Sequence, residues 1–419
     1  MSSLKITPDQ IKLGYAIKLP SGWLKHPFLS SSLTIENAQQ IQIIQSLGLD
    51  YVYFYPEKSK QIQSDILQCP DDEDINFNCQ LSEAQARLQQ DKMKRIEQAK
   101  AHRRDLQKTE KAFQHSLNQV KSLMKLLGSR PLNAISEADQ LIGLLTDNIV
   151  NAQSLVLHLM SGSSKEQENL YYHALNVSIL SMMLAKNLDY SAENIKIAGI
   201  GALFHDVGKL KIPTQILRKT TPLTAPEANL LKLHTRFGTE LVSLADNFPL
   251  EASVILEQHH EHIDGSGYPK GLSNQQIHPL ARLVAVVNAF DNLCHPSDGS
   301  KGRSPHHALS HLYRSMKGKL GEQEMKMLIR MMGVYPPGTL VMLNDNRVAM
   351  VMSVNSEHLL LPNVMIYDPD VPRLEAPVIT LEADKLMISK VIMPSALPEQ
   401  VVEYLNPRAQ VSYYVQGKP

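Results

Sequence analysis

Histidines gathered on predicted helices constrain the fold of this chain more than any other feature. Six of the sixteen histidines lie between residues 173 and 262, in segments whose apolar residues recur every three or four positions. His173 shares one helix face with Val177, Leu180 and Leu184, which predicts that its ring points into a core. A helical bundle with imidazoles inside it is therefore the expected centre of the molecule.

Other histidines of this group stand at the ends or on the apolar faces of further predicted helices. One helix ends in His205-Asp206-Val207-Gly208-Lys209, and a third ends in His259-His260. Between them, the capping box Thr224-Ala225-Pro226-Glu227 predicts a helix that bears Leu230, His234, Phe237 and Leu241 on one face. The loop Asp264-Gly265-Ser266-Gly267-Tyr268-Pro269 precedes a last helix with Ala281, Val284, Asn288 and Asp291 on one face.

Metal binding explains this group better than a set of ordinary core histidines. One inward histidine is more often a satisfied core residue than a ligand, but five buried together with Asp206 need a partner for every polar atom. A shared metal centre would supply those partners. The Asp206 carboxylate can bridge two cations while His205, about 100° around the helix, holds one of them.

Composition excludes several other classes of protein. Lys plus Arg equals Asp plus Glu, so the net charge is zero, which argues against wholesale binding of a nucleic-acid polymer. Cys69, Cys79 and Cys294 form no CxxC pair, which argues against a disulfide scaffold or a cysteine-ligated zinc finger. The N-terminus lacks a signal-peptide pattern and no apolar run is long enough for a membrane span, so we expect a cytoplasmic protein with no membrane partner.

The chain is expected to be mainly α, in four parts. Residues 1–62 are predicted to form a small α+β module, with a helix from Ile35 to Leu47 and a strand at Val52-Tyr53-Phe54. An acidic linker and a long charged helix occupy 63–130, the helical domain 131–332, and a small β-rich domain 333–419. In this last part, Leu340-Val341-Met342-Leu343 and residues 348–352 flank a turn and predict a hairpin.

The helix predicted at 82–128 carries an interrupted heptad seam. Apolar positions alternate by three and four, with Arg103 and Glu110 interrupting them. A homodimer through this helix and a helix that packs within its own chain both remain open.

The histidine pattern resembles an HD-GYP domain, a subclass of the HD metal-dependent phosphohydrolases. HDVGK at 205–209 followed by HHE at 259–261 and DGSGYP at 264–269 is specific for it, and the resemblance covers roughly residues 150–330. Residues 1–60, with GWLKHPF, also resemble the N-terminal module often fused to bacterial HD-GYP proteins, which implies no function for the module.

The resemblance implies an HD-type helical bundle that hydrolyses the phosphodiester of cyclic di-GMP to the linear dinucleotide or GMP, in bacterial signalling. His173, His205 and Asp206 would hold one divalent ion, and Asp206, His234, His259 and His260 a second. Two such ions, with Fe or Mn expected, would acidify a bridging water and neutralise phosphate charge. Asp206 and Lys209 would be the catalytic residues, with Lys209 at the scissile phosphate and Gly267, Tyr268 and Pro269 shaping the substrate pocket.

The sequence departs from the family pattern at two places. Asn288 stands where the family has an aspartate ligand, so the first metal position would gain an amide oxygen without its charge. The arginine-containing segment after this helix is replaced by residues 294–303, in which Lys301 or Arg303 would be the only substitutes. Asn169 stands where three-metal relatives have an acid, with Glu168 beside it, which favours two metals.

Three functions therefore remain open from the sequence. The first is hydrolysis of cyclic di-GMP. The second is a degenerate domain that binds the dinucleotide or a partner protein with little or no hydrolysis, as Asn288 and the missing arginine-containing segment suggest. The third is hydrolysis of another nucleotide, against which the GYP loop argues.

Overall fold

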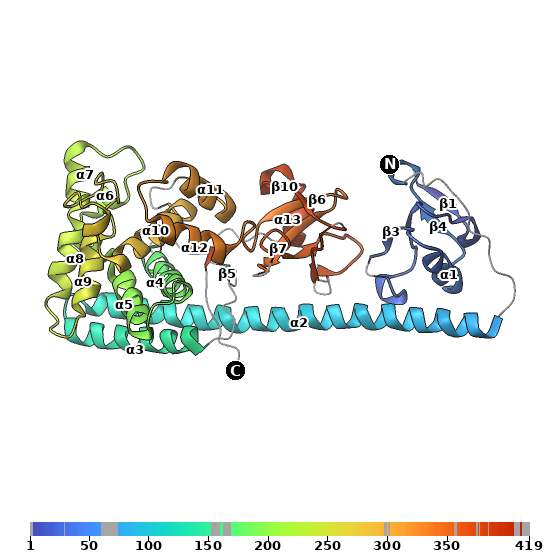
Figure 1. Cartoon of the computed structure of the whole chain (residues 1–419), viewed down its shortest axis with the longest axis horizontal. Coiled ribbons are helices and arrows are strands. Elements are labelled where there is room, and N and C mark those ends of the chain that lie inside the picture. Colours follow the sequence, from blue (N-terminus) through green and yellow to red (C-terminus); the bar gives the residue numbers. More distant parts are fainter. Residues whose placement is uncertain are drawn as a thin grey trace. The chain divides into compact units, whose positions relative to one another are not determined.

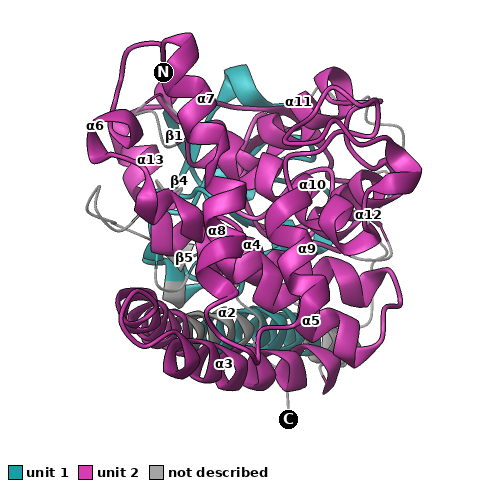
Figure 2. Ribbon diagram, turned by 90° about the vertical axis from the view of Figure 1, so that its left-hand side faces the viewer, with its two compact units in different colours: residues 1–103, 365–379 teal, residues 104–364, 380–419 magenta. Residues whose placement is uncertain are grey.

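Helices dominate the chain, as expected for its fold class (Figure 1). The computed structural model describes residues 3–28, 30–59, 74–151, 160–161, 169–296, 300, 302–355, 358–373, 376, 378–383, 385–405 and 411–412. Internal contacts divide it into two units, residues 1–103 with 365–379 and residues 104–364 with 380–419 (Figure 2). The four-part division expected from the sequence stays a prediction.

The N-terminal module is a small α+β structure. Strands β1 (Leu4–Ile6), β2 (Ala16–Lys18), β3 (Ser32–Thr34) and β4 (Val52–Phe54) form an antiparallel sheet in the order β1-β4-β2-β3. Helix α1 (Ala38–Ser46) buries Ile43 and Ile44 in the core of this module. The predicted helix start at Ile35 was wrong, because the Asn37 side chain accepts a hydrogen bond from the Gln40 N–H at 2.9 Å and caps the helix there.

The long charged helix is α2 (Asp74–Leu126), and it begins earlier than the predicted residue 82. From Phe113 to Leu127 its seam is buried in the apolar core that it shares with α3 (Pro131–Asn151). This half of the seam therefore packs against helices of its own chain. No helix among the described residues is both long and apolar enough to cross a membrane.

Four helices form the centre of the second unit, α4 (Asn169–Asn187), α5 (Ala192–Phe204), α9 (Leu250–Gln258) and α10 (Pro279–Cys294), with α11 (Pro305–Ser315) and α12 (Glu322–Met332) beside them (Figure 1). Residues 172–185 of α4 are buried on every side. Polar side chains on α4, including the predicted inward ring of His173, therefore need partners inside the bundle.

Three shorter helices complete the bundle, α6 (Thr214–Leu217), α7 (Ala225–Lys232) and α8 (His234–Val242). The predicted capping box is present, since Glu227 Oε2 accepts from the Thr224 N–H at 2.7 Å. The single helix expected to continue through His234 was wrong. Helix α7 ends before Leu233, where ψ is −8°, and a separate helix, α8, starts at His234.

The C-terminal region carries a five-stranded sheet in the order β10-β6-β7-β8-β9. Its strands are β6 (Leu340–Leu343), β7 (Val348–Ser353), β8 (Asn363–Ile366), β9 (Val378–Thr380) and β10 (Ile388–Val391), followed by α13 (Glu399–Leu405). Strand β5 (Met160–Ser161) pairs with β11 (Val411–Ser412). The predicted hairpin is confirmed as β6 and β7, which are antiparallel.

Candidate metal centre

Three histidines stand at helix ends, and a hydrogen bond to the backbone there fixes the orientation of each ring. The Nδ1–H groups of His205, His234 and His259 each donate to the carbonyl three residues earlier, at 2.7, 2.7 and 3.0 Å. The acceptors are Ala202, Leu231 and Leu256, in the last turns of α5, α7 and α9, where helix carbonyls have no partner within the helix. Since Nδ1 carries the proton, a neutral ring presents a lone pair at Nε2.

His173 reaches the same state by a different contact. It lies inside α4, and its Nδ1–H donates to the buried Asp291 carboxylate at 2.6 Å. A carboxylate behind an imidazole fixes the tautomer and makes the opposite nitrogen a better ligand. Each of these four rings, on four different helices, is therefore protonated at Nδ1 and presents a lone pair at Nε2.

These lone pairs face each other in two pairs. The Nε2 atoms of His173 and His205 lie 3.2 Å apart, and those of His234 and His259 lie 3.3 Å apart. Two lone pairs at this distance cannot form a hydrogen bond. Two imidazole nitrogens that each stand about 2.1 Å from one cation would be about 3.0–3.4 Å apart, so each pair has the spacing of ligands to a shared ion.

Asp206 lies between the two pairs. Its Oδ2 is 3.4 Å from Nε2 of His205, while its Oδ1 is 3.3 Å from Nε2 of His234. Oδ1 is buried and has no hydrogen-bond partner among the described residues. An orphaned carboxylate oxygen in a dry interior is costly, and a cation beside it would remove that cost.

Charges around Asp206 keep it ionised. Burial alone would raise the pKa of Asp206, but the Lys209 ammonium, whose Nζ is 2.6 Å from Oδ2, and the ring of His205 hold that pKa well below its ordinary value. Burial also lowers the pKa of His234, His259 and His260, and this effect outweighs that of the nearby Asp206 carboxylate, which raises the pKa of each ring. The cluster therefore combines one carboxylate with neutral imidazoles, the donor set of first-row divalent ions.

His260 lies beside the second pair of histidines, His234 and His259. Ligand atoms of Asp206, His234, His259 and His260 lie within 4.8 Å of one another, as do those of His173, His205 and Asp206. Tyr268 of the GYP loop stacks on the His260 ring, with centroids 4.6 Å apart and planes 18° from parallel. Burial raises the pKa of Tyr268, so its hydroxyl stays protonated, and the stacking holds His260 against the cluster.

Glu261 fixes the loop that carries Tyr268. This carboxylate is buried, and it accepts from the backbone N–H of Lys270 at 2.7 Å and of Leu272 at 2.9 Å. Gly267 lies so close to this turn that a Cβ there would stand 2.3 Å from the backbone nitrogen of His262. The HHE and GYP elements are thus parts of one folded loop.

Gly208 has an equally direct role beside His234. A Cβ at Gly208 would lie 1.9 Å from the carbonyl oxygen of His234. The backbone of the 3-10 helix Val207–Lys211 therefore packs directly on α8. This close approach brings Asp206 within reach of the second histidine pair.

Asn288 lies at the first pair, as expected from its position on α10. Its Oδ1 is 3.1 Å from Nε2 of His173 and accepts from the Asn292 amide at 2.7 Å. The amide oxygen is therefore turned toward the histidine. Asn288 adds an oxygen donor to His173, His205 and Asp206, but no negative charge.

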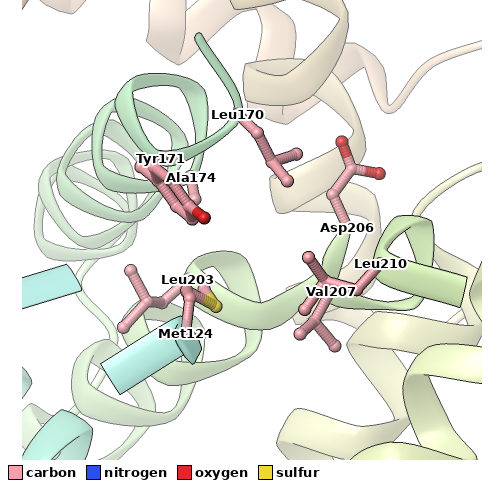
Figure 3. Close-up of a pocket in the computed structure, with 8 residues that line it drawn as sticks. All are labelled: Met124, Leu170, Tyr171, Ala174, Leu203, Asp206, Val207 and Leu210. Carbon is pink, nitrogen blue, oxygen red and sulfur yellow. The ribbon is translucent and has the colours of Figure 1, made fainter. Parts of the chain in front are cut away.

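An apolar hollow borders Asp206 (Figure 3). Besides Asp206 it is lined by Met124, Leu170, Tyr171, Ala174, Leu203, Val207 and Leu210.

The remaining predicted residues lie elsewhere. Arg303 is exposed, and Lys301 and Glu168 fall outside the described residues. His262 contacts Ser266, while His278 caps α10 by accepting from the Leu280 N–H. Sequence reasoning missed the roles of Glu261 and of His295, which contacts Asp291; only the spacing of four between Asp291 and His295 could have indicated the latter.

Comparisons with known proteins place two known domains in this chain. The sequence profile of the HD domain matches residues 150–322, and that of a domain of unknown function (DUF3391) matches residues 3–138. The chain is 30% identical over 234 residues to a cyclic di-GMP phosphodiesterase of Pseudomonas aeruginosa, covering 55% of this chain and 56% of that protein.

Two further relatives match over shorter stretches. The cyclic di-GMP phosphodiesterase response regulator RpfG of Xanthomonas campestris is 38% identical over 34% of this chain and 38% of its own length. The 3'3'-cGAMP-specific phosphodiesterase 1 of Vibrio cholerae is 31% identical over 36% of this chain and 32% of its own length. The chain thus spans about half, or less, of the relatives that it matches. The helical bundle over residues 150–322 thus matches the HD domain profile, and it carries the HDxGK, HHE and GYP elements on which the resemblance to HD-GYP domains rests.

Proposed function

We propose that this chain hydrolyses a phosphodiester bond of cyclic di-GMP with two divalent cations, Fe or Mn. His173, His205 and Asn288 would hold one cation and His234, His259 and His260 the other, with Asp206 between them. The observation that carries the proposal is the pair of facing Nε2 lone pairs on each side of a single carboxylate.

The residues around the cluster have separate tasks. Bound cations would supply Lewis-acid charge and a water of lowered pKa. Lys209, whose side chain is 20% exposed beside Asp206, would place its ammonium against a phosphate oxygen as negative charge develops there. Tyr268 holds His260 in place, and Gly267 and Pro269 shape the loop at the edge of the substrate pocket.

The choice of substrate rests on the relatives. Two of them are named for cyclic di-GMP and one for 3'3'-cGAMP, so a cyclic dinucleotide is the supported class and cyclic di-GMP the first candidate. The alternative of binding without hydrolysis rests on Asn288 and on the missing arginine-containing segment, and the named activities of the relatives argue against it.

Two further proposals concern assembly and location. A homodimer through the 82–128 helix is also proposed, and it would not use Ile96 or the seam from Phe113 to Leu127, because these residues are buried in their own chain. A cytoplasmic location agrees with the substrate class, and no nucleic-acid polymer or membrane is proposed as a partner.

Hydrolysis is tested with protein stripped by a chelator and reloaded with Mn²⁺ or Fe²⁺, using cyclic di-GMP, 3'3'-cGAMP and a nucleoside triphosphate as substrates. We expect metal-dependent formation of the linear dinucleotide or GMP. Lys209→Gln should lose most turnover, while Lys211→Gln, which changes a more exposed lysine two residues later, should not. Full metal loading without turnover of any cyclic dinucleotide would contradict the proposal.

A further inference from the structure

A buried carboxylate behind the first histidine pair is shared by two histidines. Asp291 is fully buried, and its Oδ2 accepts from His173. Its other oxygen, Oδ1, accepts from Nδ1 of His295 at 3.1 Å and from the Asn176 amide at 3.3 Å. His173 is therefore connected through one carboxylate to the ring of His295 at the C-terminal end of α10.

His295 is held in the geometry that this contact requires. It is the C-cap of α10, and its backbone N–H donates to the carbonyl of Asp291 at 2.7 Å. The ring then folds back onto the side chain of the same residue. Its side chain is 16% exposed, so the ring closes the carboxylate off from solvent.

The second contact matters because an aspartate carboxylate rotates easily. The terminal torsion of aspartate has broad minima, so a single hydrogen bond from His173 would leave the carboxylate plane loosely defined. Donors on Oδ1 remove this freedom. The direction of the Nδ1–H bond of His173, and with it the direction of its Nε2 lone pair, is then fixed.

We propose that His295 is a positioning residue for the first metal position, acting through Asp291 on His173. The inference rests on the proposed metal centre. It matters in this chain because Asn288 brings no charge to that position, so the first cation depends more on the placement of His173 and His205. The second position, at His234 and His259, shares no contact with Asp291 among the described residues.

The test is a titration of metal-free protein with Mn²⁺ in the absence of nucleotide. His295→Ala should weaken one of two dissociation constants by about 10–100-fold, the range for outer partners of metal ligands, and leave the other unchanged. His295→Asn, which keeps an N–H donor near the position of Nδ1, should restore most of the affinity. His311→Ala, on neighbouring α11, is the control and should match the wild type.

A His234→Ala background assigns the effect. With the second position removed, His295→Ala should still weaken the remaining Mn²⁺ site. Equal Mn²⁺ affinities in wild type and His295→Ala would overturn the inference. A loss of affinity at both positions that His295→Asn does not restore would also overturn it, because it would indicate a structural role. A wild type that binds no Mn²⁺ would instead contradict the proposed function, and thermal unfolding of each metal-free variant separates both outcomes from misfolding.

Discussion

The Nε2 atoms of His173 and His205 face each other at 3.2 Å, and neither ring can donate to the other because each Nδ1–H is already used. The same relationship holds between His234 and His259. An arrangement with lone pairs on both sides of a contact is unfavourable without a cation. The bundle holds it because each ring is fixed by a helix end or by Asp291.

Asn288→Asp should strengthen the first metal position. A carboxylate at the site of the amide oxygen, 3.1 Å from His173, adds a full negative charge, and charges about 4 Å apart interact by about 4 kcal/mol at an effective dielectric constant of 20. We expect Mn²⁺ affinity to rise by more than about tenfold, measured by titration of metal-free protein. Asn194→Asp, about 16 Å along α5 from His205, should leave it unchanged; equal effects of both variants would contradict this reading.

Gly208→Ala should separate the two halves of the cluster. Its Cβ would lie 1.9 Å from the backbone oxygen of His234, and backbone shifts of this kind cost about 1–3 kcal/mol or more. We expect a lower Tm and weaker metal binding. Gly143→Ala, on α3 with no atom within 4 Å of the new Cβ, should raise stability by about 0.5–1 kcal/mol. A Gly208→Ala protein with wild-type metal content would be inconsistent with the close packing.

Glu261→Gln should act on substrate handling more than on metal content. The carboxylate accepts two backbone N–H groups of the loop after Tyr268, and replacing one oxygen by an NH2 group leaves a buried donor facing a donor, at a cost of about 1–3 kcal/mol. Turnover should fall while both metals remain bound. Glu257→Gln, which breaks only a partly exposed ion pair with Lys270, should change stability by less than about 1 kcal/mol.

His26 should make the N-terminal module sensitive to acid. Burial, and then the nearby Lys92 ammonium, lower the pKa of His26 from 6.5 to about 4. The folded module thus binds fewer protons than the unfolded chain, so its stability should fall as pH drops from about 6.5 to about 4 and stay constant above that range. Trp23 is the only tryptophan and lies in this module, so its fluorescence during urea unfolding follows the module alone.

The control for this prediction is His26→Gln, which cannot titrate but can keep the contact that Nε2 of His26 makes with Ser31 at 3.0 Å. Its urea midpoint should change less between pH 7 and pH 4.5 than that of the wild type. Identical pH dependence in both proteins would assign the acid sensitivity to other groups.

Local signals predicted most of what surrounds the cluster. The stripe of His173, Val177, Leu180 and Leu184 is buried as expected, because α4 is apolar enough to lie in the centre of the bundle. The capping box at Thr224 and the hairpin after residue 340 follow from side chains that act on their own neighbours. The pairing of histidines on separate helices was predictable only because burial of so many imidazoles requires a shared partner.

Features set by tertiary contacts were not predictable. The break at Leu233 has no glycine or proline to mark it, and it lies where the backbone of His234 packs closely against Gly208. The contacts of the two Asp291 carboxylate oxygens and the anchoring of the loop by Glu261 depend on groups that come together only in the folded bundle. Their signals in the sequence are single polar residues on apolar faces, which also occur where no such contact exists.

The most direct test of the central claim is the metal content of the purified chain, measured by elemental analysis after reloading with Mn²⁺ and removal of excess metal. The wild type should hold two ions per chain, His234→Ala should hold one, and Asp206→Asn should bind both weakly and lose more than about 100-fold in turnover, beyond the loss expected for an outer partner. Two ions retained in Asp206→Asn with full turnover, or no ion in the wild type, would contradict the account.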